Sequence, residues 1–70
     1  MGGNTVRILL WQVRANKGLT LRQLEELTGI SRATLNNIEN GKVSPQLDYL
    51  EKIAIAMDVR ITDLFESDYK

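Results

Sequence analysis

Residues 20–41 read TLRQLEELTGISRATLNNIENG, and this stretch decides the fold. Leucine and isoleucine recur at helical spacing on both sides of Gly29, which can adopt the left-handed conformation that ends a helix. Thr20 can cap the first segment, because Gln23 stands three residues later and can complete a capping box. Ser31 can cap the second segment. The pattern therefore predicts two short helices that meet at a steep angle through a glycine turn.

Further helices are predicted on both sides of this pair. Residues 5–17 form the first of them, and Gly18 can end it. Its apolar residues at helical spacing are Val6, Leu9, Leu10 and Val13. Ser44 followed by Pro45 is typical of a helix start. The buried face of that later helix is expected to hold Leu47, Leu50, Ile53, Ala54 and Met57.

The end of the chain adds one more short helix, which Thr62 and Asp63 can open and which carries Leu64 and Phe65. We therefore expect an all-α fold, a compact bundle of about five short helices. A chain of 70 residues has room for one core only. We expect a disordered start at residues 1–4, one domain over residues 5–67 with the central pair at 20–40, and a frayed tail at 68–70.

Composition excludes several classes of function. The chain has no cysteine and no histidine, so it offers no disulfide, no evident nucleophile or general base, and no typical metal site. We expect no enzymatic activity, no cofactor, no metal and no small-molecule ligand. The longest apolar run, residues 8–11, is too short to cross a bilayer, so no membrane partner is expected and the protein should be cytoplasmic. Its formal net charge is zero.

Four short motifs carry a resemblance that covers nearly the whole chain. They are Lys17-Gly18-Leu19-Thr20, Gly29-Ile30-Ser31, Ile38-Glu39-Asn40-Gly41-Lys42 and Ser44-Pro45. In sequence and order they resemble the phage repressor and Cro (XRE-like) helix-turn-helix family of bacterial and phage transcription regulators. The resemblance implies a lambda-repressor-like domain that binds double-stranded DNA sequence-specifically. It also implies a transcriptional regulator, expected to be a repressor, that reads the major groove with the second helix of the central pair.

The same helix supplies the candidate base contacts. Because Leu35 and Ile38 face inward, the polar face turns toward solvent. The candidates are Arg32, Ala33, Thr34, Asn36 and Asn37. Arginine can donate two hydrogen bonds to guanine, asparagine can pair with adenine, and a methyl group can touch a thymine methyl. By resemblance, Arg32, Ala33 and Asn37 are the best placed, although an ordinary solvated helix face would look similar.

Candidate phosphate contacts lie around the motif, at Thr20, Ser31, Asn40 and Lys42. Each could equally be a simple cap or turn residue. The cations Lys17, Arg22, Arg32 and Lys42 lie at the motif, whereas most acidic residues lie downstream. Such an uneven distribution is what a neutral DNA-binding chain needs.

The resemblance also assigns Arg14 and Glu39 to a structural ion pair between the first helix and the end of the second helix of the central pair. Two positions depart from the family. Leu21 stands where a phosphate-binding glutamine is frequent, and Glu25 where a small alanine is frequent. Glu25 therefore needs a partner or solvent.

Two apolar groups remain as candidate interfaces. Ile8, Trp11 and Ala15 form a second apolar face on the first helix, which either a partner or the chain's own tail with Tyr69 could cover. Residues Val59, Ile61, Leu64 and Phe65 lie where the family often pairs, so a homodimer is expected unless they only complete the core. The alternative function is a protein-interaction or antitoxin-like module that uses the Trp11 face.

Overall fold

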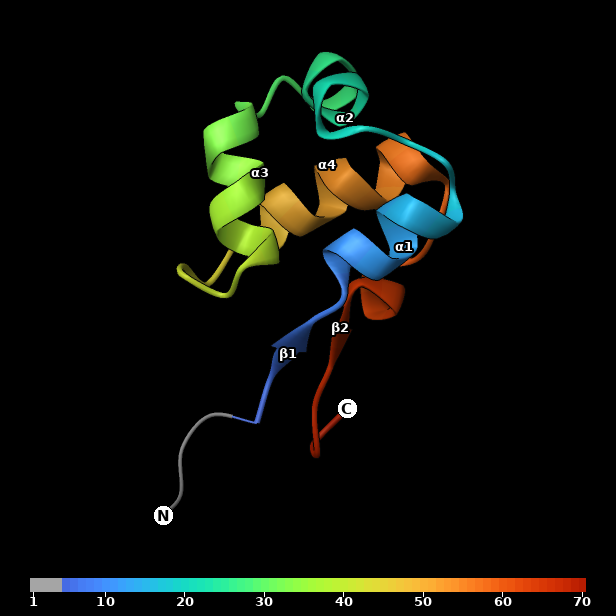
Figure 1. The fold of residues 1–70 in the computed structure, drawn as a ribbon. Helices are drawn as coiled ribbons and strands as arrows, with labels where there is room; N and C mark the ends of the chain where they lie inside the picture. The colour runs from blue at the N-terminus through green and yellow to red at the C-terminus, as the bar shows by residue number, and fades with distance from the viewer. Residues whose placement is uncertain (1–4) are drawn as a thin grey trace.

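Four α-helices form the body of the fold in the computed structural model, which describes residues 5–70 (Figure 1). The helices are α1 (Leu10–Asn16), α2 (Leu21–Thr28), α3 (Arg32–Glu39) and α4 (Leu47–Met57). A single 3-10 turn, η1 (Ile61–Leu64), and two short strands, β1 (Arg7–Ile8) and β2 (Phe65–Glu66), complete the described part. The predicted disordered start, residues 1–4, lies outside it.

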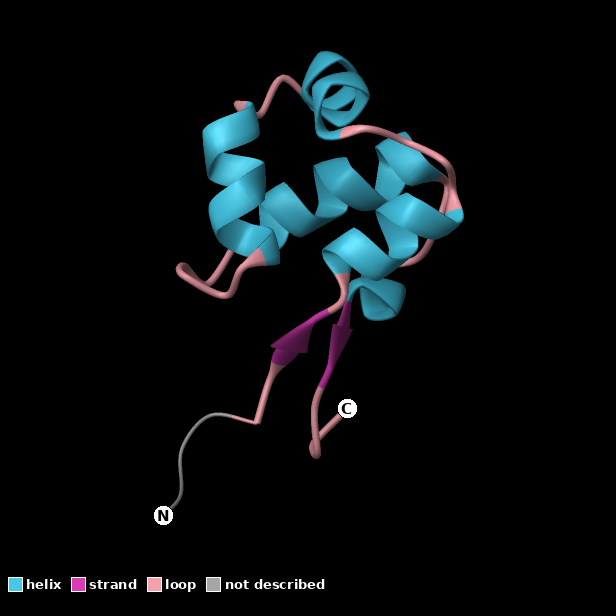
Figure 2. Cartoon of the chain, viewed as in Figure 1, coloured by secondary structure: helices cyan, strands magenta, loops and turns pink. Residues whose placement is uncertain are grey.

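The helical class is confirmed, but the expected number of helices is wrong, because four α-helices form and the fold includes a small sheet (Figure 2). Strands β1 and β2 pair antiparallel, with Arg7 opposite Glu66 and Ile8 opposite Phe65. The backbone N–H of Leu9 donates to the carbonyl of Leu64 at 2.8 Å. This pairing holds residues 7 and 8 extended, so α1 begins at Leu10 and not at Thr5.

The last predicted helix is also shorter than expected. Only residues 61–64 turn, as the 3-10 helix η1, and the backbone N–H of Arg60 before it donates to Asp63 Oδ2 at 3.0 Å. Phe65 leaves the turn and joins β2. The strand partner of Phe65 lies at the other end of the chain, so local helical spacing could not indicate this change.

Helix α4 begins later than predicted. Its N-terminal cap position is Gln46, no side chain caps it, and Ser44 lies in the preceding loop. Leu47, the first residue of the helix, is exposed and does not belong to the buried face. The other four predicted members of that face are buried. At 11 residues α4 is the longest helix of residues 5–70, well short of the length that a membrane span requires.

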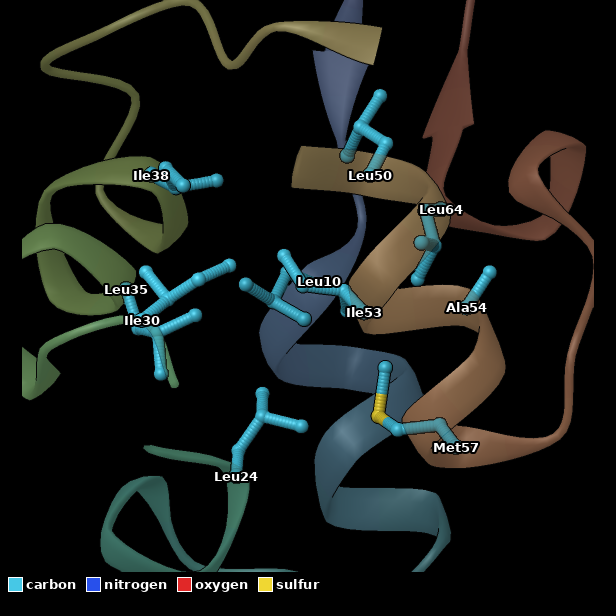
Figure 3. Packing of buried hydrophobic residues seen from close by; sticks show 10 residues of the cluster. All are labelled: Leu10, Leu24, Ile30, Leu35, Ile38, Leu50, Ile53, Ala54, Met57 and Leu64. Carbon is cyan, nitrogen blue, oxygen red and sulfur yellow. The ribbon is translucent and has the colours of Figure 1, made fainter. Parts of the chain in front are cut away.

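The core lies between α4 and the other helices, as Figure 3 shows. Its buried members are Leu10, Leu24, Ile30, Leu35, Ile38, Leu50, Ile53, Ala54, Met57 and Leu64. Every α-helix and η1 contributes at least one of them. Since most of these residues are large aliphatics, truncating one should cost about 2–5 kcal/mol. The core therefore fixes the position of α2 and α3 relative to the rest of the domain.

Candidate nucleic-acid interface

The turn between α2 and α3 sets the geometry of the candidate site. Gly29 adopts φ 75°, a left-handed conformation, and its N–H donates to the carbonyl of Glu25 at 2.8 Å. The hydroxyl of Thr28 donates to the carbonyl of Leu24 at 2.7 Å and accepts from the N–H of Ile30 at 3.1 Å. Ile30 itself is buried. The chain therefore turns sharply between the two helices, and Figure 1 shows α2 nearly end-on while α3 runs from top to bottom in the plane of the picture.

Both helices of the pair begin at the predicted caps. The hydroxyl of Thr20 accepts from the N–H of Gln23 at 3.0 Å, and the Gln23 side-chain oxygen accepts from the N–H of Thr20 at 2.8 Å. The hydroxyl of Ser31 accepts from the N–H of Thr34 at 3.2 Å. These bonds satisfy backbone donors that the first turn of a helix leaves without partners. They also fix where α3 begins.

The outer face of α3 presents most of the predicted base-contacting residues. Arg32, Ala33 and Asn36 are exposed and Asn37 is half-buried. Leu35 and Ile38, on the opposite side, are fully buried. Helical geometry therefore gives α3 one solvent-facing, largely polar face, which we call the α3 outer face: Arg32, Ala33, Asn36 and Asn37.

Thr34 lies apart from this group. It is half-buried, its hydroxyl is 3.0 Å from that of Ser31, and it lines a shallow hollow together with Pro45 and Tyr49. Thr34 thus points toward the start of α4, away from the α3 outer face.

The predicted phosphate-contacting residues border the α3 outer face and are all exposed. The hydroxyls of Thr20 and Ser31 already accept backbone N–H groups as helix caps. They would therefore bind a phosphate together with the backbone N–H groups at the N-termini of α2 and α3. Asn40 and Lys42 follow α3 directly, and the backbone N–H of Lys42 donates to the carbonyl of Asn37 at 2.9 Å. Among the ion pairs of residues 5–70, none involves the Lys42 side chain.

Arg14 and Glu39 lie in direct contact. Arg14 Nε donates to Glu39 Oε2 at 2.6 Å, and Arg14 Nη2 donates to Glu39 Oε1 at 3.1 Å. Arg14 Nη1 also donates to the carbonyl of Leu19 at 3.0 Å. The side chains are 20% and 7% exposed, and hydrogen bonding to Glu39, partly offset by burial, raises the pKa of Arg14 above its ordinary value. The pair ties α1, the following loop and α3 together.

A second ion pair crosses the turn itself, between Glu25 of α2 and Arg32 of α3. Arg32 Nε lies 3.0 Å from Glu25 Oε1, and the backbone N–H of Arg32 donates to Glu25 Oε2 at 3.4 Å. The sequence predicts that Glu25 needs either a partner or solvent, but it does not indicate which, nor that the partner is Arg32. One feature of the sequence could have indicated this pair: Glu25 and Arg32 are seven positions apart, one on each side of the glycine turn.

The structure changes the predicted membership of the face around Trp11 and decides against one of the two covers that the sequence left open. Trp11 and Ala15 are exposed on α1, but Ile8 belongs to β1 and packs against the core, so it is not part of that helix face. The tail does not cover the face either, because Tyr69 is 90% exposed and Trp11 remains 52% exposed. Val59, Ile61 and Phe65 are half-buried, and the first two pack against the core.

Comparison with known proteins identifies the family. The helix-turn-helix family model HTH_3 matches residues 12–64. The chain is 36% identical over 63 residues to an uncharacterized HTH-type transcriptional regulator of Archaeoglobus fulgidus, and the match covers 90% of each protein. It is 32% identical over 60 residues to the regulator SinR of Bacillus subtilis, covering 84% of this chain. The crystal structure of the restriction-modification controller protein C.AhdI from Aeromonas hydrophila matches with a TM-score of 0.74 and 30% identity, over 77% of this chain and 82% of that one.

The chain therefore belongs to the helix-turn-helix family, which confirms the resemblance seen in the sequence. Family membership also agrees with the expectation that the chain is not an enzyme. The chain spans 54% of the length of SinR and 37% of that of the Bacillus subtilis regulator SlrR.

Proposed function

We propose that this chain binds double-stranded DNA sequence-specifically through the α3 outer face and acts as a transcriptional regulator, most simply as a repressor that occupies a promoter. The observation that carries the proposal is the α3 outer face itself, solvent-facing and largely polar on a helix that is capped and anchored in the core. Family membership supports the same assignment. The proposal places the protein in the cytoplasm, with its DNA.

The chemistry of the face favours direct readout. Arg32 can donate two hydrogen bonds to guanine O6 and N7, and Asn36 or Asn37 can pair with the edge of an adenine. Ala33 offers a methyl group to thymine. Lys42, Asn40 and the N-termini of α2 and α3 surround this face and would position it on the phosphates.

A selection from random duplexes at fixed salt tests this proposal. We expect enrichment of a defined sequence that contains guanine and adenine at separate positions, with an affinity at least about a thousandfold above that for random duplex. A library that remains unenriched after repeated rounds would contradict sequence-specific binding. Monovalent salt must be held constant throughout, because the phosphate contribution depends steeply on it.

A homodimer is part of the proposal. Val59, Ile61 and Phe65 are only half-buried in the single chain, so they can lose further apolar surface against a second copy. A twofold dimer would read two half-sites about 34–36 Å apart. The selection should then enrich a palindromic site, and sedimentation of the complex should give two protomers per duplex. One protomer on a single half-site would contradict the dimer.

A second candidate function is a protein-interaction or antitoxin-like module. The exposure of Trp11 favours it, because a half-exposed tryptophan is typical of interaction surfaces. On this alternative Trp11→Ala abolishes association with a partner protein and leaves the DNA affinity unchanged. Unchanged assembly in the Trp11→Ala variant would rule it out.

A further inference from the structure

The ion pair between Glu25 and Arg32 joins the helix that supports the α3 outer face to the first residue of that face. One carboxylate oxygen of Glu25 lies 3.0 Å from Arg32 Nε, and the other accepts the backbone N–H of Arg32 at 3.4 Å. A single side chain of α2 thus contacts both the backbone and the guanidinium of the leading base-reading candidate.

This contact leaves a particular edge of Arg32 available. A guanidinium carries five N–H donors, and the Nε atom of Arg32 is the one that lies 3.0 Å from the Glu25 carboxylate as an ion pair. The two terminal nitrogens, Nη1 and Nη2, remain for another acceptor pair. Guanine presents such a pair at O6 and N7 in the major groove. Glu25 therefore favours an approach in which Arg32 meets guanine through its terminal nitrogens.

The pair contributes little to stability. The side chain of Arg32 is 60% exposed and that of Glu25 is 35% exposed, so water screens their attraction. Exposed pairs of this kind typically contribute about 0–1 kcal/mol. Glu25 therefore acts less on the stability of the domain than on what Arg32 can bind.

The negative charge of Glu25 has a second effect, on phosphates. A carboxylate beside Arg32 compensates the positive charge that would otherwise attract any DNA backbone. It also repels phosphates directly, whatever the base sequence. Both effects weaken binding to unrelated DNA, whereas the bidentate contact with guanine still forms at the correct site.

From this geometry we propose that Glu25 is a specificity-determining, positioning residue. It pairs with the Nε side of Arg32 and accepts from the Arg32 backbone N–H, so that the terminal nitrogens can meet one guanine, and its charge opposes the use of Arg32 as a general phosphate anchor. The inference rests on the proposed function and deepens it, because it assigns a role in DNA discrimination to a residue that need not contact DNA.

Two variants separate the two parts of this role. Glu25→Gln keeps an oxygen that can accept from the Arg32 backbone N–H and lie beside the guanidinium but removes the charge, so affinity for random duplex should rise while preference for guanine is largely retained. Glu25→Ala removes both, so affinity for random duplex should rise and preference at that guanine should fall at least about threefold. The matched control is Glu26→Gln, because Glu26 is exposed on α2 and forms none of the ion pairs of residues 5–70.

Dissociation constants are measured for the selected duplex, for the duplex with that guanine replaced, and for random duplex, at three salt concentrations. Arg32→Ala identifies the guanine, and in the Arg32→Ala background Glu25→Ala should no longer change preference at that position. The melting temperature of Glu25→Ala should stay close to that of the parent protein. A Glu25→Ala variant that behaves like Glu26→Gln on all three duplexes, or one whose effect persists without Arg32, would overturn the proposal.

Failure of the underlying function gives a different result. If the unsubstituted protein shows no sequence preference, the proposed function and the role of Glu25 both fall. If it shows a preference that Glu25→Ala leaves intact at the Arg32 position, only the role of Glu25 falls.

Discussion

Arg14 connects three parts of the domain through one side chain. Its bonds to Glu39 and to the carbonyl of Leu19 join α1, the α1–α2 loop and the end of α3. Removing it leaves the nearly buried carboxylate of Glu39 without its partner. Such a loss is far more costly than that of an exposed pair.

We therefore expect Arg14→Ala to lower the free energy of unfolding by about 3–5 kcal/mol in urea denaturation. Lys17→Ala, which removes an exposed cation from the residue after the same helix, is the control and should change it by less than about 1 kcal/mol. Equal losses in the two variants would show that the Arg14–Glu39 contact is not special.

Lys42 should act on affinity and not on sequence preference. Its exposed position after α3 suits a phosphate contact, so Lys42→Ala should weaken binding to all duplexes alike. The slope of log affinity against log salt should become shallower by about one unit. Arg60→Ala removes an exposed cation outside the α2–α3 pair and serves as the comparison. The assignment fails if Lys42→Ala alters preference between sequences or if Arg60→Ala has the same effect.

The elements that were predicted well are those whose signals are local. The Thr20–Gln23 capping box and the Gly29 turn lie within a few residues of the helices that they bound, and both are present. The sheet was missed because β1 and β2 come from opposite ends of the chain, and neither is long enough to show alternation. The ion pair of Glu25 with Arg32 was not predicted for a related reason, since it depends on how α2 and α3 cross.

Gly29 allows a test of the turn between these two helices. A Cβ at this position would meet no atom within 4 Å, so only the positive φ opposes a side chain. Gly29→Ala should therefore lower stability by about 1–2 kcal/mol. Gly29→Asn should cost less, because asparagine adopts the left-handed region more readily. Thermal unfolding compares the two, and a Gly29→Ala variant as stable as the parent would contradict the account of this turn.

At the level of the whole molecule, a chain with no formal net charge must bind DNA with a local surplus of cations. Residues 17–42 carry four cations, Lys17, Arg22, Arg32 and Lys42, against three carboxylates, Glu25, Glu26 and Glu39, which leaves a surplus of one positive charge in this segment. Each phosphate contact contributes about −0.9 to the slope of log affinity against log salt. We expect a slope of about −2 to −4 per protomer. A slope near zero would show that the phosphates are not engaged.

The central claim is that α3 reads DNA through its outer face. The most direct measurement is the duplex selection, carried out in parallel with the unsubstituted protein, with Arg32→Ala and with Asn37→Ala. The account predicts one enriched site that each variant relaxes at a single, different base position, with a loss of about 1–3 kcal/mol there. Identical enriched sites for all three proteins would contradict it, because the bases would then be read by some other surface.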